Sequence, residues 1–333
     1  MTTTDNGRRE LSVADMFNST VAAAALGAAW ELGALDELHR VGALDVDSFA
    51  TEGELHLPSV EEMFRALASV GIVERDNRKV RPGRAFAAAY RAKPLFYWLW
   101  QGSGELFARM PALLRNANRV GTFYHRDAKA VSYASRQANA TFFDPVFRQA
   151  MRPLEGRFST VVDLGSGSGE RVIQIAEENP AVRAYGLDIA DEVVAMANEE
   201  AERRGLADRV TFLTADVREL SPRPEFAGTE LLTCFMMGHD LWPRDEAIVS
   251  LRRLRELFPN VRRFLLGDTV RTVGIPDEEI PVFTLGFELG HTLMGQYLPT
   301  AEEWRGVFAE GGWRCVGEHG SDVLAGTVVF ELE

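Results

Sequence analysis

The chain has 333 residues, of which 46% are hydrophobic and 26% are charged, so it has enough apolar side chains for a packed core and is long enough for two domains. Its formal net charge of -13 at pH 7 argues against non-specific binding to nucleic acid or to anionic membranes, because both need a positive protein surface. Residues 1–10 lack the apolar core of a signal peptide, and the apolar run 21–30 is too short to span a bilayer. We therefore expect a cytoplasmic protein that binds neither nucleic acid nor membrane.

The first half of the chain is expected to be mainly helical. Apolar residues recur at helical spacing through residues 11–38, and the pattern of residues 59–70 predicts another helix. Two short runs, residues 71–74 and 79–81, follow that helix and flank a turn, which predicts a β-hairpin. A helix followed by such a hairpin is a winged-helix pattern.

The charges on the helix predicted over residues 59–70 argue against a DNA-binding role for this pattern. The helix carries Glu61 and Glu62 against a single Arg65, and acidic side chains repel phosphate. Aromatic residues are frequent farther on, in residues 94–150, where we expect further helices. We therefore predict that residues 1–152 form a mainly helical, winged-helix-like domain that serves dimerisation and covers the substrate as a lid.

From residue 160 onward, predicted strands and helices alternate, as they do in a parallel α/β sheet. Apolar runs predict strands near residues 160–164, 183–187, 210–213, 231–235 and 263–267. The last two runs, residues 313–319 and 326–332, predict a C-terminal hairpin that adds an antiparallel strand to the sheet. We predict that residues 153–333 form a Rossmann-like α/β domain.

Acidic residues end the first three predicted strands of this domain, and glycines follow the first of them. Asp163 precedes three glycines in a turn that leads into a helix, and such a turn brings backbone N–H groups close to a ligand. Asp188 ends the second strand, where a carboxylate can bind a ribose diol, and Asp216 ends the third. This arrangement resembles the S-adenosylmethionine (SAM) site of class I methyltransferases; the alternatives are a nicotinamide dehydrogenase and a structural glycine turn. The predicted cofactor-binding residues are Asp163, Gly165, Gly167, Gly169, Asp188, Ile189, Asp216, Val217, Phe235 and Met236.

The fourth predicted strand is followed by His239 and Asp240. Ligands of open α/β sheets bind beyond the carboxyl ends of the strands, so we expect both side chains at the mouth of the cofactor cleft. Residues 239–242 resemble the His-Asp-Trp segment of plant-type small-molecule O-methyltransferases, in which the histidine is the general base on a hydroxyl. Residues 298–304 resemble another segment of that family, although Pro299 stands where that family has an arginine.

A second histidine, His291, lies in the region expected to bind substrate, where plain O-methyltransferases seldom have one. Two histidines from separate loops that flank one cleft supply what a mononuclear metal site needs. Imidazole suits iron or zinc, and the remaining coordination positions leave room for a chelating substrate. We therefore predict one metal ion, iron or zinc, with His239 and His291 as its ligands.

The chain as a whole resembles the α-keto acid C-methyltransferases of nonribosomal-peptide biosynthesis. The matching runs span nearly the full length and are residues 98–105, 126–127, 163–171, 234–240, 264–268 and 283–291. The resemblance implies that His239 and His291 hold the metal ion beside Asp240. It also implies that Trp98 and Arg126 contact the substrate and that the protein is a homodimer. The implied reaction is transfer of the SAM methyl group to the β-carbon of a small-molecule 2-oxo acid of the phenylpyruvate or 4-methyl-2-oxovalerate type.

The chemistry implied by this resemblance is consistent with these residue types. The β-carbon of a 2-oxo acid is nucleophilic only as an enol or enolate, which a cation chelating the keto oxygen and the carboxylate stabilises. The base is Asp240 or a metal-bound water, and the last metal positions are left open among Asp240, Glu288 and water. Two other functions stay open: a metal-independent O-methyltransferase with His239 as general base, and a non-catalytic SAM-binding regulator that uses the winged helix on DNA.

Overall fold

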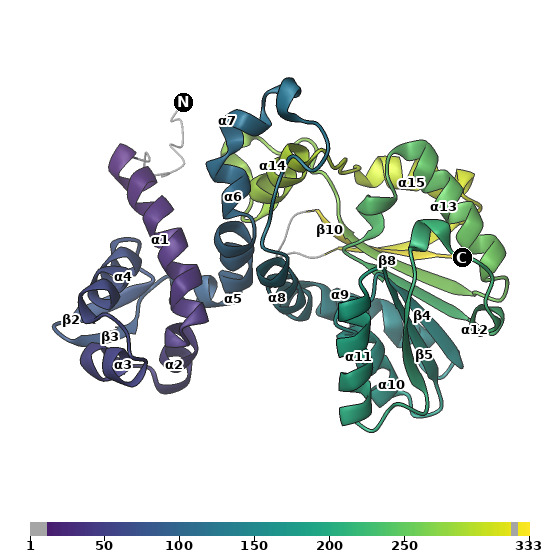
Figure 1. Ribbon diagram of the computed structural model, residues 1–333, viewed down its shortest axis with the longest axis horizontal. Helices are drawn as coiled ribbons and strands as arrows, with labels where there is room; N and C mark the ends of the chain where they lie inside the picture. The colour runs from purple at the N-terminus through teal and green to yellow at the C-terminus, as the bar shows by residue number, and fades with distance from the viewer. Residues whose placement is uncertain (1–11, 321–325) are drawn as a thin grey trace, which may run out of the picture. The chain divides into compact units, whose positions relative to one another are not determined.

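The computed structural model describes residues 12–320 and 326–333, and contacts divide the chain into two compact units (Figure 1). Unit 1 comprises Met1–Ala108 and His125–Gln137, and unit 2 comprises Arg109–Tyr124 and Ala138–Glu333. These contact units do not test the predicted division into domains of residues 1–152 and 153–333, which stays a prediction. Within the described parts of the chain, no helix has both the length and the apolar character needed to cross a membrane.

The first unit is mainly helical and carries a small sheet, as the winged-helix pattern predicts. Its elements are α1 (Val13–Glu31), α2 (Ala34–Val41), β1 (Leu44–Asp45), α3 (Val46–Glu52), α4 (Leu57–Ser69), β2 (Val73–Asp76), β3 (Lys79–Pro82), α5 (Phe86–Tyr97), the π-helical turn η1 (Trp98–Gly102), α6 (Gly104–Ala108) and α8 (Ala128–Ala138). The strands pair antiparallel in the order β1-β3-β2. Gly33, whose φ is 81°, separates α1 from α2 within the region where the sequence showed continuous helical spacing.

The second unit contains the α/β fold. Its helices and turns are α7 (Met110–Leu113), η2 (Asn116–Asn118), η3 (Asn139–Phe143), α9 (Asp144–Met151), η4 (Arg152–Leu154), α10 (Glu170–Glu178), α11 (Asp191–Arg203), η5 (Val217–Glu219), α12 (Pro224–Ala227), η6 (Gly238–Leu241), α13 (Arg244–Leu257), η7 (Asp277–Glu279), α14 (Thr284–Met294) and α15 (Ala301–Glu310). Its strands are β4 (Thr160–Leu164), β5 (Arg183–Asp188), β6 (Val210–Thr214), β7 (Leu231–Phe235), β8 (Arg263–Thr269), β9 (Cys315–Gly320) and β10 (Thr327–Leu332).

One sheet organises the second unit, and its topology confirms the predicted fold class. The strand order is β6-β5-β4-β7-β8-β10-β9, in which the first five strands are parallel. Strand β10 runs antiparallel to both β8 and β9, so the C-terminal hairpin lies where the sequence predicted it. Chain order reverses between β4 and β7, and the crevice at such a switch point is where open α/β sheets bind ligands.

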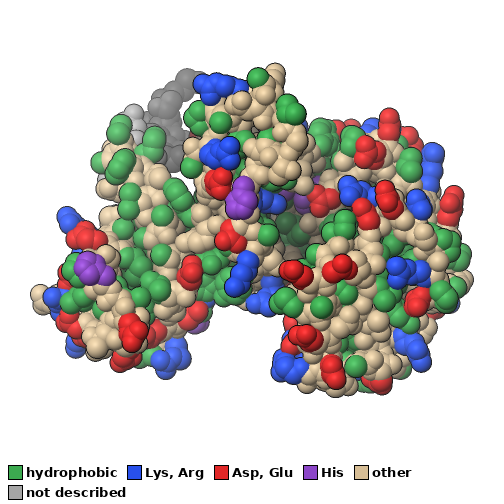
Figure 2. All heavy atoms as spheres, viewed as in Figure 1, with side chains coloured by type: hydrophobic (Ala, Val, Ile, Leu, Met, Phe, Trp, Pro, Cys, Tyr) green, Lys and Arg blue, Asp and Glu red, His purple; other side chains and the backbone are tan. Residues whose placement is uncertain are grey.

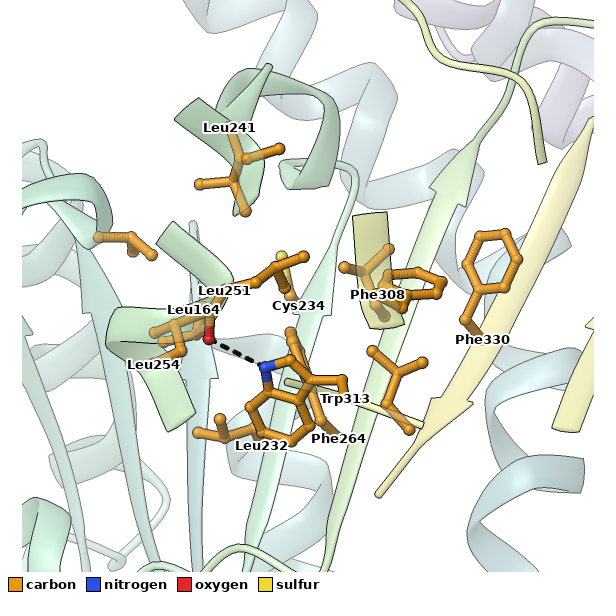
Figure 3. Packing of buried hydrophobic residues seen from close by; sticks show 14 of the residues in the cluster. Leu164, Leu232, Cys234, Leu241, Leu251, Leu254, Phe264, Phe308, Trp313 and Phe330 are labelled. Atoms are coloured by element: carbon orange, nitrogen blue, oxygen red, sulfur yellow. Dashed lines mark hydrogen bonds between the residues drawn. The ribbon is translucent and has the colours of Figure 1, made fainter. Parts of the chain in front are cut away.

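Helices cover both faces of this sheet, with α10 and α11 on one side and α12, α13 and α15 on the other (Figure 1). Figure 3 shows the packing on the second side, where Leu251 of α13, Phe308 of α15 and Phe330 of β10 belong to one buried cluster. Trp313 joins this cluster and its Nε1 donates to the carbonyl of Leu251 at 2.9 Å. Burial of this apolar surface holds the carboxyl ends of the strands in fixed positions.

The described surface carries charges of both signs. On the face seen in Figure 2, acidic and basic side chains are interspersed over both units. On helix α4, Arg65 is exposed and pairs with Glu62 of the preceding turn. This pairing adds no net positive charge to the helix that a winged-helix protein would use on DNA.

Candidate active site

The loop between β4 and α10 carries three glycines with different roles. Gly165, Gly167 and Gly169 all have positive φ (70°, 51° and 76°), which other residues rarely adopt. A Cβ at Gly165 would lie 2.8 Å from Met237 Cγ, and one at Gly169 would lie 2.3 Å from the Phe212 ring. Around Gly167, no described atom lies within 4 Å of an added Cβ. Packing therefore requires the outer glycines, while Gly167 presents bare backbone to open space.

Hydrogen bonds fix the carboxylates of two strand-end acids, Asp188 and Asp216. Asp188 accepts from the backbone N–H groups of Gly167 (2.9 Å) and Ala190 (3.0 Å), which fixes its carboxylate against the glycine loop. Asp216 accepts from the backbone and the guanidinium of Arg218, and these hydrogen bonds lower the pKa of Asp216. A carboxylate oxygen accepts more than one hydrogen bond, so Asp188 keeps capacity for the hydroxyls of a ribose.

The remaining strand-end acid, Asp163, is buried among charged and polar groups. Its Oδ1 accepts from Thr233 Oγ1 at 2.6 Å. Burial raises the pKa of Asp163 to about 6, although the charge of Arg171 and the hydrogen bond from Thr233 act in the opposite direction. Arg171 is also buried, with its Nη1 atom 3.3 Å from Asp144 Oδ1 and its guanidinium carbon 3.7 Å from the centre of the Phe235 ring.

A cleft of about 760 Å³ lies at the carboxyl ends of these strands. Among the predicted cofactor residues, those that line it are Gly165, Asp188, Ile189, Asp216, Val217, Phe235 and Met236. Asp163, Gly167 and Gly169 are not part of its lining; Asp163 and Gly169 are buried and Gly167 is half-buried. The volume is in the range typical of small-ligand sites. The cofactor contacts of these residues stay predictions.

Two buried histidines meet at the other end of this site. His239 lies in η6, directly after β7, lines the cleft and places its Nδ1 atom 2.8 Å from Oδ1 of Asp268 on β8. His291 lies on α14 and places its Nδ1 atom 2.7 Å from the carbonyl oxygen of Phe287, one helical turn earlier. The two ring centroids are 5.0 Å apart and the ring planes are nearly perpendicular, at 87°. The structure thus brings together two side chains that are far apart in sequence.

These contacts determine which ring nitrogen carries the hydrogen. A carbonyl oxygen only accepts, so Nδ1 of His291 donates to Phe287. A carboxylate at Asp268 would likewise accept a hydrogen bond from Nδ1 of His239. In the neutral form of each ring, Nε2 then carries the lone pair, which is the atom that binds a metal ion or takes up a proton.

The acids near the histidines have other hydrogen-bond partners. Asp240 lines the cleft, is exposed, and accepts from Nε2 of Gln296 at 2.9 Å. Glu288 accepts from the backbone and hydroxyl of Thr272, at 2.8 and 2.9 Å, and so ties α14 to the segment after β8. The described residues contain no group of three or more His, Cys, Asp or Glu side chains placed to hold a metal ion.

Trp98 and Arg126, the predicted substrate contacts, belong to the first unit. Trp98 begins the π-helical turn η1 and is 5% exposed. Arg126 is half-buried in the irregular segment before α8, next to Asp127, whose side chain accepts from the backbone N–H of Ala130. Their roles at the substrate stay predictions.

Sequence reasoning missed two residues of this site. Asp268 ends β8 just as Asp163 and Asp188 end their strands, so the same strand-end pattern could have found it. Arg171 follows the glycine loop by two positions, and its burial beneath aromatic rings has no signal in the sequence.

Comparisons with known proteins agree with this geometry. Residues 157–237 match a family model described as "Methyltransferase domain". The chain is 48% identical to Methyltransferase ungE' of Aspergillus campestris over 96% of both chains, and 24% identical to the indolepyruvate C-methyltransferase of Streptomyces griseus over 95% of this chain and 92% of that one. The solved structure of the mitomycin 7-O-methyltransferase MmcR superposes with a TM-score of 0.67 at 20% identity, covering 96% of each chain. From the first of these relatives and from its fold, the chain belongs to the class I SAM-dependent methyltransferases.

Proposed function

We propose that the protein transfers the methyl group of SAM to the β-carbon of a 2-oxo acid and that His239 and His291 hold one iron or zinc ion. The observation that carries this proposal is the pair of buried imidazoles, each oriented through Nδ1 by an oxygen acceptor. Histidines that bind metals nearly always donate their other ring N–H to a carboxylate or a backbone carbonyl, and both forms occur here. The similarity to an indolepyruvate C-methyltransferase adds support, because indolepyruvate is a 2-oxo acid.

The spacing of the two rings fits a shared ion. Imidazole nitrogen binds zinc at about 2.1 Å, and with the ring centre roughly 1.1 Å farther away, two ligands at about 90–110° have ring centres about 4.5–5.2 Å apart. The observed distance between the ring centroids is 5.0 Å. Two protein nitrogens are fewer than catalytic zinc usually has, so the keto oxygen and carboxylate of the substrate are proposed to complete the site.

A bound ion would supply Lewis-acid stabilisation of the negative charge on the keto oxygen of the enolised substrate. Asp240, held by Gln296, is the proposed base that removes the proton from the β-carbon. Arg126 pairs with the substrate carboxylate, and Trp98 forms a wall of the substrate pocket. The bond between the methyl carbon and sulfur breaks as the bond between the methyl carbon and the β-carbon forms, so S-adenosylhomocysteine is the second product.

A second candidate function is metal-independent O-methylation with His239 as general base. The observation that favours it is the 2.8 Å contact between His239 and Asp268, because a carboxylate on Nδ1 orients an imidazole for proton transfer through Nε2. In this function His239 would take the proton of a hydroxyl while the oxygen accepts the methyl group. The structural similarity to an O-methyltransferase shows the shared fold and leaves the acceptor atom undecided.

The experiment that separates the two functions uses SAM with a ¹³C-labelled methyl group. Phenylpyruvate, 4-methyl-2-oxovalerate and a set of phenols are each incubated with the enzyme before and after chelation, and the labelled position is read by NMR. We expect label on the β-carbon of a 2-oxo acid, loss of transfer after chelation, and recovery when iron or zinc is restored. Label on oxygen, or transfer that chelation leaves unchanged, contradicts the metal-assisted C-methyltransferase and favours His239 as base.

We also propose that the protein acts as a homodimer through α1. Val13, Met16 and Phe17 lie on this helix and are 82%, 58% and 70% exposed, which is unusual for large apolar side chains grouped together. Sedimentation analysis of the wild type and of Phe17→Glu tests this: we expect a dimer that the variant dissociates, and a monomeric wild type contradicts it.

A further inference from the structure

Arg171 occupies an unusual position for an arginine in this protein. It lies in the first turn of α10, two residues after the glycine loop, and is 9% exposed. Its guanidinium carbon is 3.7 Å from the centre of the Phe235 ring and 4.6 Å from that of Phe147. Phe235 lines the cleft, so the buried guanidinium lies against a residue of the space proposed for the cofactor.

The charges around Arg171 are unevenly matched. Its Nη1 atom lies 3.3 Å from Asp144 Oδ1, yet this atom makes no hydrogen bond within the described residues. The second acid that influences Arg171 is Asp163, which is also buried. Arg171 thus acts on both acids, whereas the half-buried Asp144 is also influenced by Arg148, and Asp188 adds a second negative charge near the buried Asp163. A buried donor without an acceptor is rare and calls for a ligand or a structural reason.

The amino-acid end of SAM carries the charges that would complete this cluster. Its ammonium group can pair with Asp163, and its carboxylate can accept from the guanidinium of Arg171. Each buried charge would then have a partner of opposite sign, which lowers the cost of burying the cluster. Arginine suits this task because its planar fork binds carboxylates with two parallel hydrogen bonds.

We propose that Arg171 recognises the α-carboxylate of SAM. The guanidinium lies against the Phe235 and Phe147 rings, which meet edge to face, and Asp144 balances its charge while no cofactor is bound. This inference rests on the cofactor site proposed above and is independent of which atom accepts the methyl group. Arg171 would distinguish SAM from adenosyl compounds that lack the amino-acid carboxylate.

Calorimetric binding of three ligands tests this role without relying on turnover. SAM carries the carboxylate, decarboxylated SAM lacks only that group, and 5′-methylthioadenosine lacks the whole amino-acid end. They are measured with the wild type, with Arg171→Met, which keeps an apolar chain against Phe235, and with Arg171→Lys, which keeps the charge without the fork. Arg218→Met is the matched control, because Arg218 lines the same cleft but is exposed and paired with Asp216.

We expect the wild type to bind SAM roughly ten- to a hundredfold more tightly than decarboxylated SAM, as the loss of a charge-assisted hydrogen-bonded pair implies. Arg171→Met should lose this preference and retain wild-type affinity for methylthioadenosine, and Arg171→Lys should lose part of it. Arg218→Met should retain the preference. Two results overturn the proposal: an unchanged preference in Arg171→Met, or an equal loss of affinity for all three ligands, which marks a purely structural arginine. If the wild type does not bind methylthioadenosine, the proposed cofactor cleft is wrong. If it binds methylthioadenosine but shows no preference for SAM over decarboxylated SAM, only the role of Arg171 is wrong.

Discussion

The glycine loop is shaped by the backbone of one continuous segment, whereas the histidine pair is assembled from side chains of η6 and α14, with Asp268 of β8 in contact with His239. Gly167 presents bare backbone to open space because it has no side chain, and Asp188 of the neighbouring strand accepts from its N–H group. In the proposed function the two imidazoles act through the atoms of their rings. The two parts should therefore respond to different substitutions: the loop to added side-chain atoms, and the histidine pair to the loss of a ring.

Removal of either imidazole should reduce activity the most. His239→Ala and His291→Ala should each lower kcat/KM by about a thousandfold or more, because both proposed ligands are needed to hold the ion. Affinity for SAM, measured by calorimetry, should change less than about threefold, since the histidines serve the acceptor rather than the cofactor. His319→Ala is the control, because this histidine pairs with Glu331 on the C-terminal hairpin. Near-normal turnover in His291→Ala would exclude the metal pair and leave His239 as the base.

A smaller loss is expected when the histidines stay and the orientation of one is weakened. Asp268→Asn should reduce kcat/KM by about ten- to a hundredfold, because the amide no longer secures the Nδ1–H tautomer of His239. In the metal-assisted reaction, added zinc or iron should restore part of the activity, whereas a general base gains nothing from it. Asp245→Asn, an exposed acid at the start of α13, is the matched control. Full activity in Asp268→Asn would show that the 2.8 Å contact has no positioning role.

At the cofactor end, adding atoms is the informative change. Gly167→Val and Gly169→Ala both place a side chain at positive φ, which costs about 1–2 kcal/mol of folding stability. The added methyl group of Gly169→Ala would also meet the Phe212 ring, so this variant should have the lower Tm. Gly167→Val should instead weaken SAM binding by roughly tenfold or more. Thermal unfolding and calorimetry on the same samples separate the two effects. Native SAM affinity in Gly167→Val would mean that the cofactor does not approach this part of the loop.

A weaker effect should come from pH, through Asp163 beside the glycine loop. Burial raises the pKa of Asp163 to about 6 from its ordinary 3.8, so its charge is lost as the pH falls through about 6. Only the ionised form pairs with the ammonium of SAM, so affinity should fall about fourfold between pH 7.5 and pH 5.5. For folding the sign is opposite: the raised pKa favours the folded protein below about pH 4, and this contribution is lost as pH rises through about 6. Asp163→Asn should flatten the binding profile, and an unchanged profile in this variant would assign the effect to another group.

The fold of the second unit could be predicted from sequence because its strands are short continuous apolar runs. Residues 160–164 and 231–235 match β4 and β7 in both bounds. Strands covered on both faces contain little except apolar residues, so in the sequence the first polar residue marks the end of each strand. The break at Gly33 was harder to predict, because helical spacing continues across it while the backbone turns into the left-handed region.

The contiguous part of the site could be predicted from spacing alone, whereas the meeting of His239 and His291 was predicted from two separate segments. Asp163 and the three glycines lie in one segment whose spacing has a physical meaning of its own. Asp268 lies 29 residues from His239 and was not assigned a role, because only the parallel pairing of β7 and β8 brings the two together. Glu288 was considered as a metal ligand from its spacing to His291, and the structure shows it bonded to Thr272 instead. Helical spacing determines which residues share a face but not which partner a carboxylate finds.

Strand β8 has a consequence for how this enzyme can change its substrate. Its Asp268 orients one imidazole, and Thr272, three residues after its end, anchors through Glu288 the helix that carries the other. One stretch of chain, β8 and the residues just after it, therefore contacts His239 and the helix that carries His291. Exposed residues of α14 such as Leu285 can vary without altering the distance between the rings. Directed evolution of acceptor range should therefore accumulate substitutions on that helix while leaving the catalytic step intact.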